Sequence, residues 1–571
     1  MAEVLRVGNC SGFYGDRLSA MREMLLGGEL DVLTGDYLAE LTMLILGRDR
    51  LKDPTLGYAR TFLRQAEDCL GLAVERGVKI VANAGGLNPA GLAERLREVA
   101  AGLGLDVRVA HVQGDDLLDR AGALGLGGAP LTANAYLGAF GIAAALTHGA
   151  DVVVTGRVTD ASVVVGPAIA RFGWTPTSYD ELAGAVVAGH VVECGAQATG
   201  GNFSGFTAAD RPLGFPLVEI AADGSCVVTK HDGTGGQVTL DTVTAQLVYE
   251  IQSATYLGPD VSTHLDSLVL TPAGPDRVRI SGATGSPPPE TLKVCVNELG
   301  GFRNQAELVL VGLDVEEKAA WVRSQLTAAL DAAPGGPPAV VEWSLARTDH
   351  EDADTEEAAS CRLRVSVRDA DAARVGTVFT APLVELALAS YPGFTLTAAP
   401  SPATPYGIYR AAHVPRSEVK EQVVMADGTT LEIADPSPVQ QHPRRVVAPV
   451  TARPPGGPLC RLPLGRVVHA RSGDKGGDAN IGVWARDAAA RPDRVAWLLD
   501  FLTPDRVRTL LPETADLDVE VFALPNLGAV NVLVHGLLGE GVAASSRFDP
   551  QAKALGEWLR SRYVDVPEAL V

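Results

Sequence analysis

Cysteine is scarce in this sequence and is never paired. The seven cysteines are scattered over 571 residues, and no two of them form a CxxC motif. Disulfide frameworks and zinc knuckles both depend on such paired cysteines. The sequence therefore argues against both, and a reducing compartment, the cytoplasm, fits it best.

Long apolar runs are also lacking. The most apolar stretch, residues 135–155, is interrupted by His148 and Asp151 and is typical of a helix followed by a strand rather than of a membrane span. The first residues begin with a strand-like run over residues 4–7 and show neither the basic start nor the apolar stretch of a signal peptide. We therefore expect a cytoplasmic protein with no membrane partner.

Positive charge is in deficit. The chain has 48 basic and 69 acidic residues, a formal net charge of -21 at pH 7. Such a surface repels the phosphate backbone, so nucleic acid is not an expected partner. An anionic small molecule could bind only where Arg, Lys or a helix N-terminus reverses the local field.

The length of the chain exceeds what one hydrophobic core supports, which predicts several domains. Within residues 1–205, short β-branched runs alternate with helical patterns such as residues 57–76 and 89–103. This alternation predicts an α/β fold with a parallel, Rossmann-like sheet. The expected strands lie at residues 5–7, 32–33, 79–82, 107–112 and 152–155.

The rest of the chain follows other patterns. Residues 206–425 predict an α+β continuation of the N-terminal domain (1–430), with a helix over 240–256. Residues 426–463 are rich in proline and predict a linker. Residues 464–571 predict a small ferredoxin-like α/β sandwich, with strands at 465–470 and 480–485.

The loops after the first strands are the first candidates for a site, because ligands of parallel sheets bind at the carboxyl ends of the strands. After the first strand, Asn9 and Ser11 lie in a glycine-rich loop whose amides could approach an anionic group. A tight turn capped by Ser11 is the alternative.

Asp36 and Glu40 follow the second strand. Four residues apart, they would share one helical face and could divide acid and base roles. The alternative is that Asp36 caps a helix and Glu40 is solvated.

Asn83, Gly85, Gly86 and Asn88 follow the third strand and could bind a carbonyl or an oxyanion, although a turn followed by a helix cap at Asn88 would use the same residues. Asp115 follows the fourth strand, next to Asp116, and one of the two could cap a helix.

Arg157 follows the fifth strand and could clamp a carboxylate or phosphate with Asp160 as its partner, or form an internal salt bridge with it. His190, Glu193 and Cys194 have helical spacing and could face one site, with His190 as acid or base and Cys194 as nucleophile. A metal there would need a further ligand such as Asp160 or Asp36, and the spacing departs from HExxH, so no metal is expected.

A glycine-rich loop near the C-terminus adds local positive charge. It contains Arg471, Ser472, Asp474 and Lys475, which together offer more charged and polar side chains than a turn requires. They could bind an anionic substrate, and a solvated hairpin tip is the alternative.

Several of these motifs together resemble the acyclic terpene utilisation (AtuA) family: GDYLAE at 35–40, NAGGLNP at 83–89, GADVVVTGR at 149–157 and GHVVECG at 189–195. The loop at 471–476 is similar to that family's C-terminal domain. The resemblance implies a large N-terminal domain, a smaller ferredoxin-like domain and a role in the acyl-CoA catabolism of branched acyclic compounds.

Our first hypothesis is therefore a hydratase or lyase that acts on an acyl-CoA small molecule, with carboxylates and His190 moving protons. No cofactor is expected beyond the CoA of the substrate. A hydrolase or acyltransferase using Cys194 or Ser11 is the second hypothesis, and a non-catalytic accessory subunit of an acyl-CoA carboxylase system is the third. We also expect a homo-oligomer.

Overall fold

The computed structural model describes residues 4–206, 211–441 and 455–571. The chain divides into two compact units. The first comprises residues 1–297, 409–542 and 549–571, and the second comprises residues 298–408 and 543–548. Within the described residues, no helix has both the length and the apolarity needed to cross a membrane.

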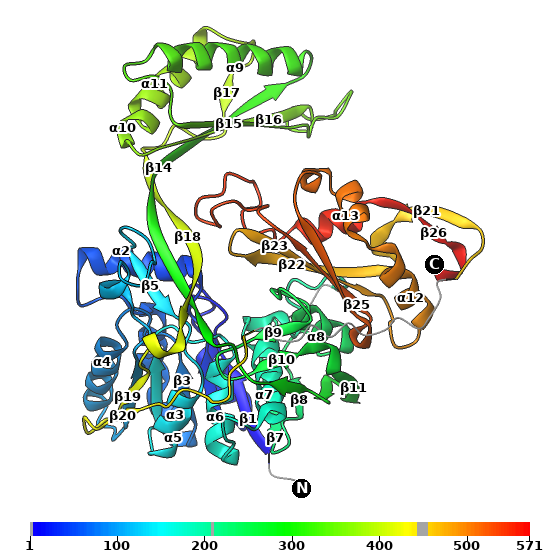
Figure 1. Ribbon diagram of the computed structural model, residues 1–571. Helices are drawn as coiled ribbons and strands as arrows, with labels where there is room; N and C mark the ends of the chain where they lie inside the picture. Colours follow the sequence, from blue (N-terminus) through cyan, green and yellow to red (C-terminus); the bar gives the residue numbers. More distant parts are fainter. Residues whose placement is uncertain (1–3, 207–210, 442–454) are drawn as a thin grey trace. The chain divides into compact units, whose positions relative to one another are not determined.

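A sheet of eleven strands forms the centre of the first unit (Figure 1). The five predicted strands form its parallel part, which confirms the predicted α/β class. They lie in the order β1 (Val4–Asn9), β2 (Val32–Gly35), β3 (Lys79–Ala82), β6 (Val152–Thr155) and β4 (Val109–Gln113).

Antiparallel strands extend this sheet on both sides. Beyond β1 lie β7 (Pro216–Ala221), β8 (Cys226–Lys230), β12 (Arg277–Ser281) and β11 (Val269–Gly274), and beyond β4 lie β19 (Gln422–Val424) and β20 (Thr430–Glu432). A Rossmann sheet instead has a second parallel half beside its first strand. The Rossmann-like part of the prediction is therefore not confirmed.

Helices cover both faces of the parallel strands, because neighbouring strand residues point to opposite sides. Leu33 and Ile80 share one core with three of the helices, whereas Val32 and Val81 share the other core with four helices. The first group is α1 (Ala20–Gly27), α3 (Arg60–Arg76) and α4 (Pro89–Gly102), and the second is α5 (Phe140–Thr147), α6 (Ser162–Phe172), α7 (Tyr179–Val192) and α8 (Leu240–Leu247).

The second unit has a core of its own. Leu308 and Val365 from its sheet pack with Val322 and Phe379 from its helices. Its sheet contains β15 (Val340–Ala346), β16 (Ser360–Asp369), β17 (Thr395–Leu396) and part of β14 (Thr291–Val311), and its helices are α9 (Val315–Ala332), α10 (Ala372–Val375) and α11 (Thr377–Glu385). The chain enters this unit through β14 and leaves it through β18 (Thr404–Pro415).

The C-terminal region contributes a four-stranded antiparallel sheet to the first unit. Its order is β22 (Val468–Lys475), β23 (Asp478–Ala485), β25 (Ala529–Val534) and β24 (Val519–Leu524), accompanied by α12 (Pro492–Phe501), α13 (Pro504–Leu510), α14 (Leu555–Ser561) and the pair β21 (Leu459–Pro463) and β26 (Tyr563–Pro567). Asn480 and Asn531 of this sheet bond to the backbone of residues 248–251, which follow α8.

Three local predictions were wrong. The helix expected over 240–256 ends at Leu247, and β9 (Thr255–Leu257) pairs with β10 (Ser262–His264), which pairs with β13 (Thr284–Ser286). Residues 471–475 of the predicted glycine-rich loop belong to strand β22. β20 and β21 lie within the range predicted as linker, of which residues 442–454 lie outside the described residues.

Candidate functional site

The loops at the carboxyl ends of the parallel strands meet, as the sequence predicts. The amide of Asp36, after β2, donates to the carbonyl oxygen of Ser11, after β1, at 3.0 Å. Asn83, after β3, donates to Asp36 Oδ1 at 2.5 Å. After β6, the amide of Arg157 donates to Asp115 Oδ2, after β4, at 2.8 Å.

Asp36 is a buried carboxyl group in a loop. Its side chain accepts from Asn83, whose own oxygen accepts from the amide of Tyr37 at 2.7 Å. Burial, and then the carboxyl groups of Asp160 and Glu193, raise the pKa of Asp36 well above its usual range, against the opposing effect of Arg157. Asp36 is therefore set up to hold a proton at neutral pH.

Glu40 lies in the opposite environment. It accepts a hydrogen bond from Tyr136 Oη at 2.8 Å and has Lys293 Nζ at 3.5 Å. Burial alone would raise its pKa, but the charges of Lys293 and Arg157 lower the pKa below its usual range. The helix α2 (Glu40–Lys52) begins only here, with Ala39 as its N-cap. The predictions that Asp36 and Glu40 share a helical face, or that Asp36 is a cap and Glu40 solvated, were both wrong.

Arg157 is a buried cation, with 2% of its surface exposed. Its Nη1 lies 2.9 Å from Asp160 Oδ1, which confirms the predicted ion pair, and 3.2 Å from the carbonyl oxygen of Leu38. The guanidinium lies 4.3 Å from the ring centroid of Tyr136, in cation–π range. Its Nε has no hydrogen-bond partner among the described residues.

Asp115 is held by Asn134 and by the amide of Arg157, both at 2.8 Å, and burial raises its pKa to about 7. Its neighbour Asp116 accepts from the amide of Leu118 at 3.0 Å. The contacts of Asp115 therefore position the loop that carries Arg157.

The end of α7 brings His190 and Glu193 together, as their spacing predicts. His190 Nδ1 lies 3.1 Å from Glu193 Oε1, and both side chains are buried. Burial, and then the charge of Lys475, lower the pKa of His190 to about 4, whereas burial, Asp160 and Glu250 raise the pKa of Glu193 well above its usual range. The other polar atom of each side chain, His190 Nε2 and Glu193 Oε2, has no partner in the described parts of the chain.

The loop after β1 holds this helix end in place. Asn9 Nδ2 donates to the carbonyl oxygens of Val192 and Glu193 at 2.8 and 3.0 Å. A Cβ at Gly12 would lie 2.3 Å from the backbone nitrogen of Gly195, so only glycine allows this close approach. Asn9 thus serves to position Glu193.

Neither predicted nucleophile is activated. Burial, and then Glu193, raise the pKa of Cys194 well above its usual range, so it is a thiol at neutral pH. Ser11 Oγ donates to the carbonyl oxygen of Phe13 at 3.0 Å and forms a turn.

The loop of residues 83–89 divides into two parts. Asn83 reaches Asp36, whereas Asn88 is the N-cap of α4 and accepts from the amide of Gly91 at 2.9 Å, which confirms the predicted cap. Gly86 has φ +54°, and a Cβ at Gly85 would lie 2.5 Å from the carbonyl oxygen of Thr155. Turn geometry and packing account for these two glycines.

The predicted C-terminal residues form part of the same surroundings and are not a solvated tip. Arg471 donates to the carbonyl oxygen of Asn202 at 3.1 Å and lies 4.3 Å from the ring centroid of Tyr249. Ser472 bonds to α14 through the amide of Gly556 at 2.8 Å. Asp474 lies 3.9 Å from Lys553 Nζ, and burial raises its pKa to about 7.

Sequence reasoning missed several residues of the site. No motif in the sequence distinguished them: Tyr136, Glu250, Tyr256, Lys293 and Lys553. We refer to the carboxyl-edge cluster as Asp36, Glu40, Tyr136, Arg157, Asp160, His190, Glu193, Glu250, Tyr256, Lys293 and Lys475. Within the described residues, no three His, Cys, Asp or Glu side chains are arranged to hold a metal ion.

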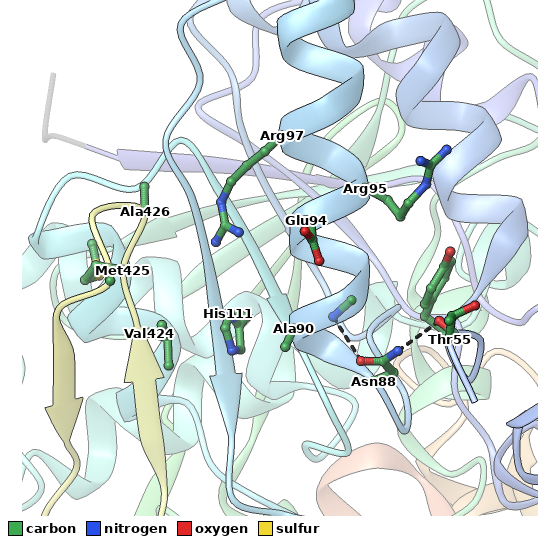
Figure 2. A pocket seen from close by; sticks show the side chains of 13 residues that line it. Thr55, Asn88, Ala90, Glu94, Arg95, Arg97, His111, Val424, Met425 and Ala426 are labelled. Atoms are coloured by element: carbon green, nitrogen blue, oxygen red, sulfur yellow. Dashed lines mark hydrogen bonds between the residues drawn. The ribbon is translucent and has the colours of Figure 1, made fainter.

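A surface cavity of about 670 Å³ lies beside α4 (Figure 2). Its lining includes no residue of the carboxyl-edge cluster. Arg95 pairs with Glu98, and Glu94 lies in the same lining, so the cavity has no concentrated charge. Its polar lining residues include Tyr58, Asn88, Glu94, Arg95, Arg97 and His111.

The fold and the cluster define a mixed α/β protein with buried acid–base groups at the carboxyl edge of a parallel sheet. The model of the acyclic terpene utilisation family protein AtuA matches residues 5–425, and that of the AtuA ferredoxin-like domain matches residues 462–565. The chain therefore belongs to the acyclic terpene utilisation family, as its motifs predict. No curated protein and no solved structure matches it.

Proposed function

We propose that the protein is a cytoplasmic enzyme that hydrates, dehydrates or cleaves a branched or unsaturated acyl thioester near its carbonyl group. The family, named for acyclic terpene utilisation, suggests the kind of carbon skeleton. The chemistry is inferred from the carboxyl-edge cluster. Such reactions need a proton donor, a proton acceptor and a positive charge where an enolate forms.

One observation carries the proposal. Arg157 Nε, His190 Nε2 and Glu193 Oε2 are buried polar atoms without a partner among the described residues. An unpaired buried polar atom costs about 1–3 kcal/mol, and a catalytic role is one of the reasons for which proteins retain this cost. The Arg157 donor, the His190 ring nitrogen and the Glu193 carboxyl oxygen are thus available to form hydrogen bonds with a reacting molecule.

Charge divides the roles among these groups. Asp36 and Glu193 have raised pKa values and can donate protons at neutral pH. His190 has a lowered pKa, about 4, and is neutral, so it can accept a proton. Groups whose environments move their pKa values apart are typical of paired acid–base catalysis. Arg157 stays charged and would stabilise the oxygen of an enolate.

The alternative of covalent catalysis receives less support. A nucleophilic cysteine needs a lowered pKa, and that of Cys194 is raised. A nucleophilic serine needs a base beside its hydroxyl group, and that of Ser11 bonds to a backbone carbonyl.

The test is mass spectrometry of branched and unsaturated acyl-CoA thioesters incubated with the purified protein, its Asp36→Asn variant and its His190→Ala variant. We expect a gain or loss of water, or a cleavage product, that falls at least about 100-fold in both variants. The matched control is Glu421→Gln, which alters a buried carboxyl group of raised pKa outside the cluster and should retain turnover. If no thioester changes mass, the enzyme proposal fails and the accessory subunit gains support.

A further inference from the structure

The hairpin between β22 and β23 is packed closely against two tyrosines. A Cβ at Gly473 would lie 2.5 Å from the ring of Tyr249, and a Cβ at Gly476 would lie 2.7 Å from the ring of Tyr409. Gly476 also has φ +71°, which favours glycine. These contacts fix the hairpin, and with it Lys475, which lies between the two glycines in sequence.

Lys475 lies close enough to His190 and Glu193 for its charge to act on both groups. Its Nζ is 6.0 Å from the ring centroid of Tyr256, which lies 5.2 Å from that of His190. The ring of Tyr409, against which the hairpin packs, lies 5.9 Å from Lys293 Nζ. The hairpin therefore brings a cation from the C-terminal sheet to Tyr256, the ring next to His190.

Lys475 differs from three neighbouring cations, Arg157, Lys293 and Lys553, in having no acidic partner within ion-pair distance. Arg157 pairs with Asp160 at 2.9 Å, and Lys293 with Glu40 at 3.5 Å. Lys553 pairs with Glu250 at 3.2 Å. No ion pair within 4 Å joins Lys475 to a carboxylate of the residues that the structure describes.

We propose that Lys475 binds a carboxylate carried by the acyl group of the substrate, so that the preferred thioesters are those of dicarboxylic acids. A half-buried ammonium that has no carboxylate within 4 Å can take a ligand with one negative charge as its direct partner. The thioester oxygen would accept a hydrogen bond from Arg157 Nε. Lys475 would then be available to bind the second charged group of the substrate, its carboxylate. This inference rests on the proposed function, because it assigns the substrate class of the same site.

The experiment compares binding of glutaryl-CoA, which ends in a carboxylate, with binding of pentanoyl-CoA, which has the same chain length and ends in a methyl group. Isothermal titration of the full chain should show at least about tenfold tighter binding of glutaryl-CoA. Lys475→Met should reduce this ratio to about one, and Lys475→Arg should keep most of it. Lys420→Met, which alters an exposed lysine, is the control and should leave the ratio unchanged.

The outcomes separate this inference from the proposed function. Equal binding of both thioesters by the wild type, a ratio unchanged in Lys475→Met, or binding of neither thioester would overturn the inference. Turnover of the thioester panel is measured separately. A carboxylate preference that depends on Lys475, found in a protein that turns over no thioester, would support the binding site and refute the catalytic proposal.

Discussion

Two regions of the first unit bury carboxyl groups of raised pKa, and they differ in how the polar atoms are satisfied. At the start of α5, burial raises the pKa of Glu421 to about 8 and that of Asp260 to about 6. Each accepts a backbone amide there, from Gly141 at 2.9 Å and from Ala139 at 2.8 Å.

The carboxyl-edge cluster also has raised pKa values, at Asp36 and Glu193, but in addition it leaves polar atoms of Arg157, His190 and Glu193 without partners. A raised pKa alone therefore does not distinguish a site from a helix cap. What separates the cluster from the groups at the start of α5 is its unpaired atoms, because a cap gains stability from its hydrogen bonds, whereas unpaired atoms cost stability.

The largest effect is expected from Arg157→Met. Removing one partner of a buried ion pair leaves Asp160 and Glu40 without this charge, so the free energy of unfolding should fall by about 3–5 kcal/mol. Urea denaturation measures this change. Arg108→Met, which removes an exposed cation from an ion pair with Asp151, should cost about 1 kcal/mol or less. Equal losses in the two variants would mean that Arg157 is not integral to the cluster.

The second prediction concerns the start of α5. Because the pKa of Glu421 is raised from 4.5 to about 8, the folded state keeps a proton that the unfolded state loses across this pH window. The free energy of unfolding therefore falls as the pH rises from 5 to 8. In Glu421→Gln this fall should be smaller, by on the order of 3 kcal/mol. Urea unfolding midpoints at both pH values measure it, and identical slopes would contradict the assignment.

Two glycines allow a smaller and more local comparison. Gly12→Ala would place a Cβ 2.3 Å from the backbone of Gly195, and the strain should cost about 1–3 kcal/mol and displace Glu193. Gly102 ends α4 with nothing within 4 Å of its Cβ position, so Gly102→Ala should stabilise by about 0.5–1 kcal/mol. Thermal unfolding and turnover are measured together. Full turnover in a destabilised Gly12→Ala variant would show that this contact does not position the catalytic pair.

Local sequence patterns predicted much of the N-terminal part of the site. Alternating strands and helices placed Asp36, Asn83 and Arg157 at one edge, because parallel strands end on the same side of a sheet. Helical spacing predicted the contact of His190 with Glu193.

The remainder of the site depends on contacts that no local pattern encodes. Lys293 reaches Glu40 from a strand 253 residues later, and Lys475 arrives from a sheet that docks against the backbone after α8 through Asn480. The same limit explains the error at Asp36, because spacing of four residues implies a shared helical face only when both residues lie in the helix, and α2 begins at Glu40.

The smallest effect on stability is expected from a substitution at Asn88. This residue also tests where the carboxyl-edge cluster ends. As the N-cap of α4 it accepts from the amide of Gly91, so Asn88→Ala should lower the free energy of unfolding by about 1 kcal/mol and leave turnover unchanged. Asn83→Ala, five residues earlier in the same loop, removes the donor to Asp36 and should reduce turnover. Loss of turnover in Asn88→Ala without loss of stability would instead assign substrate binding to the cavity beside α4, which Asn88 lines.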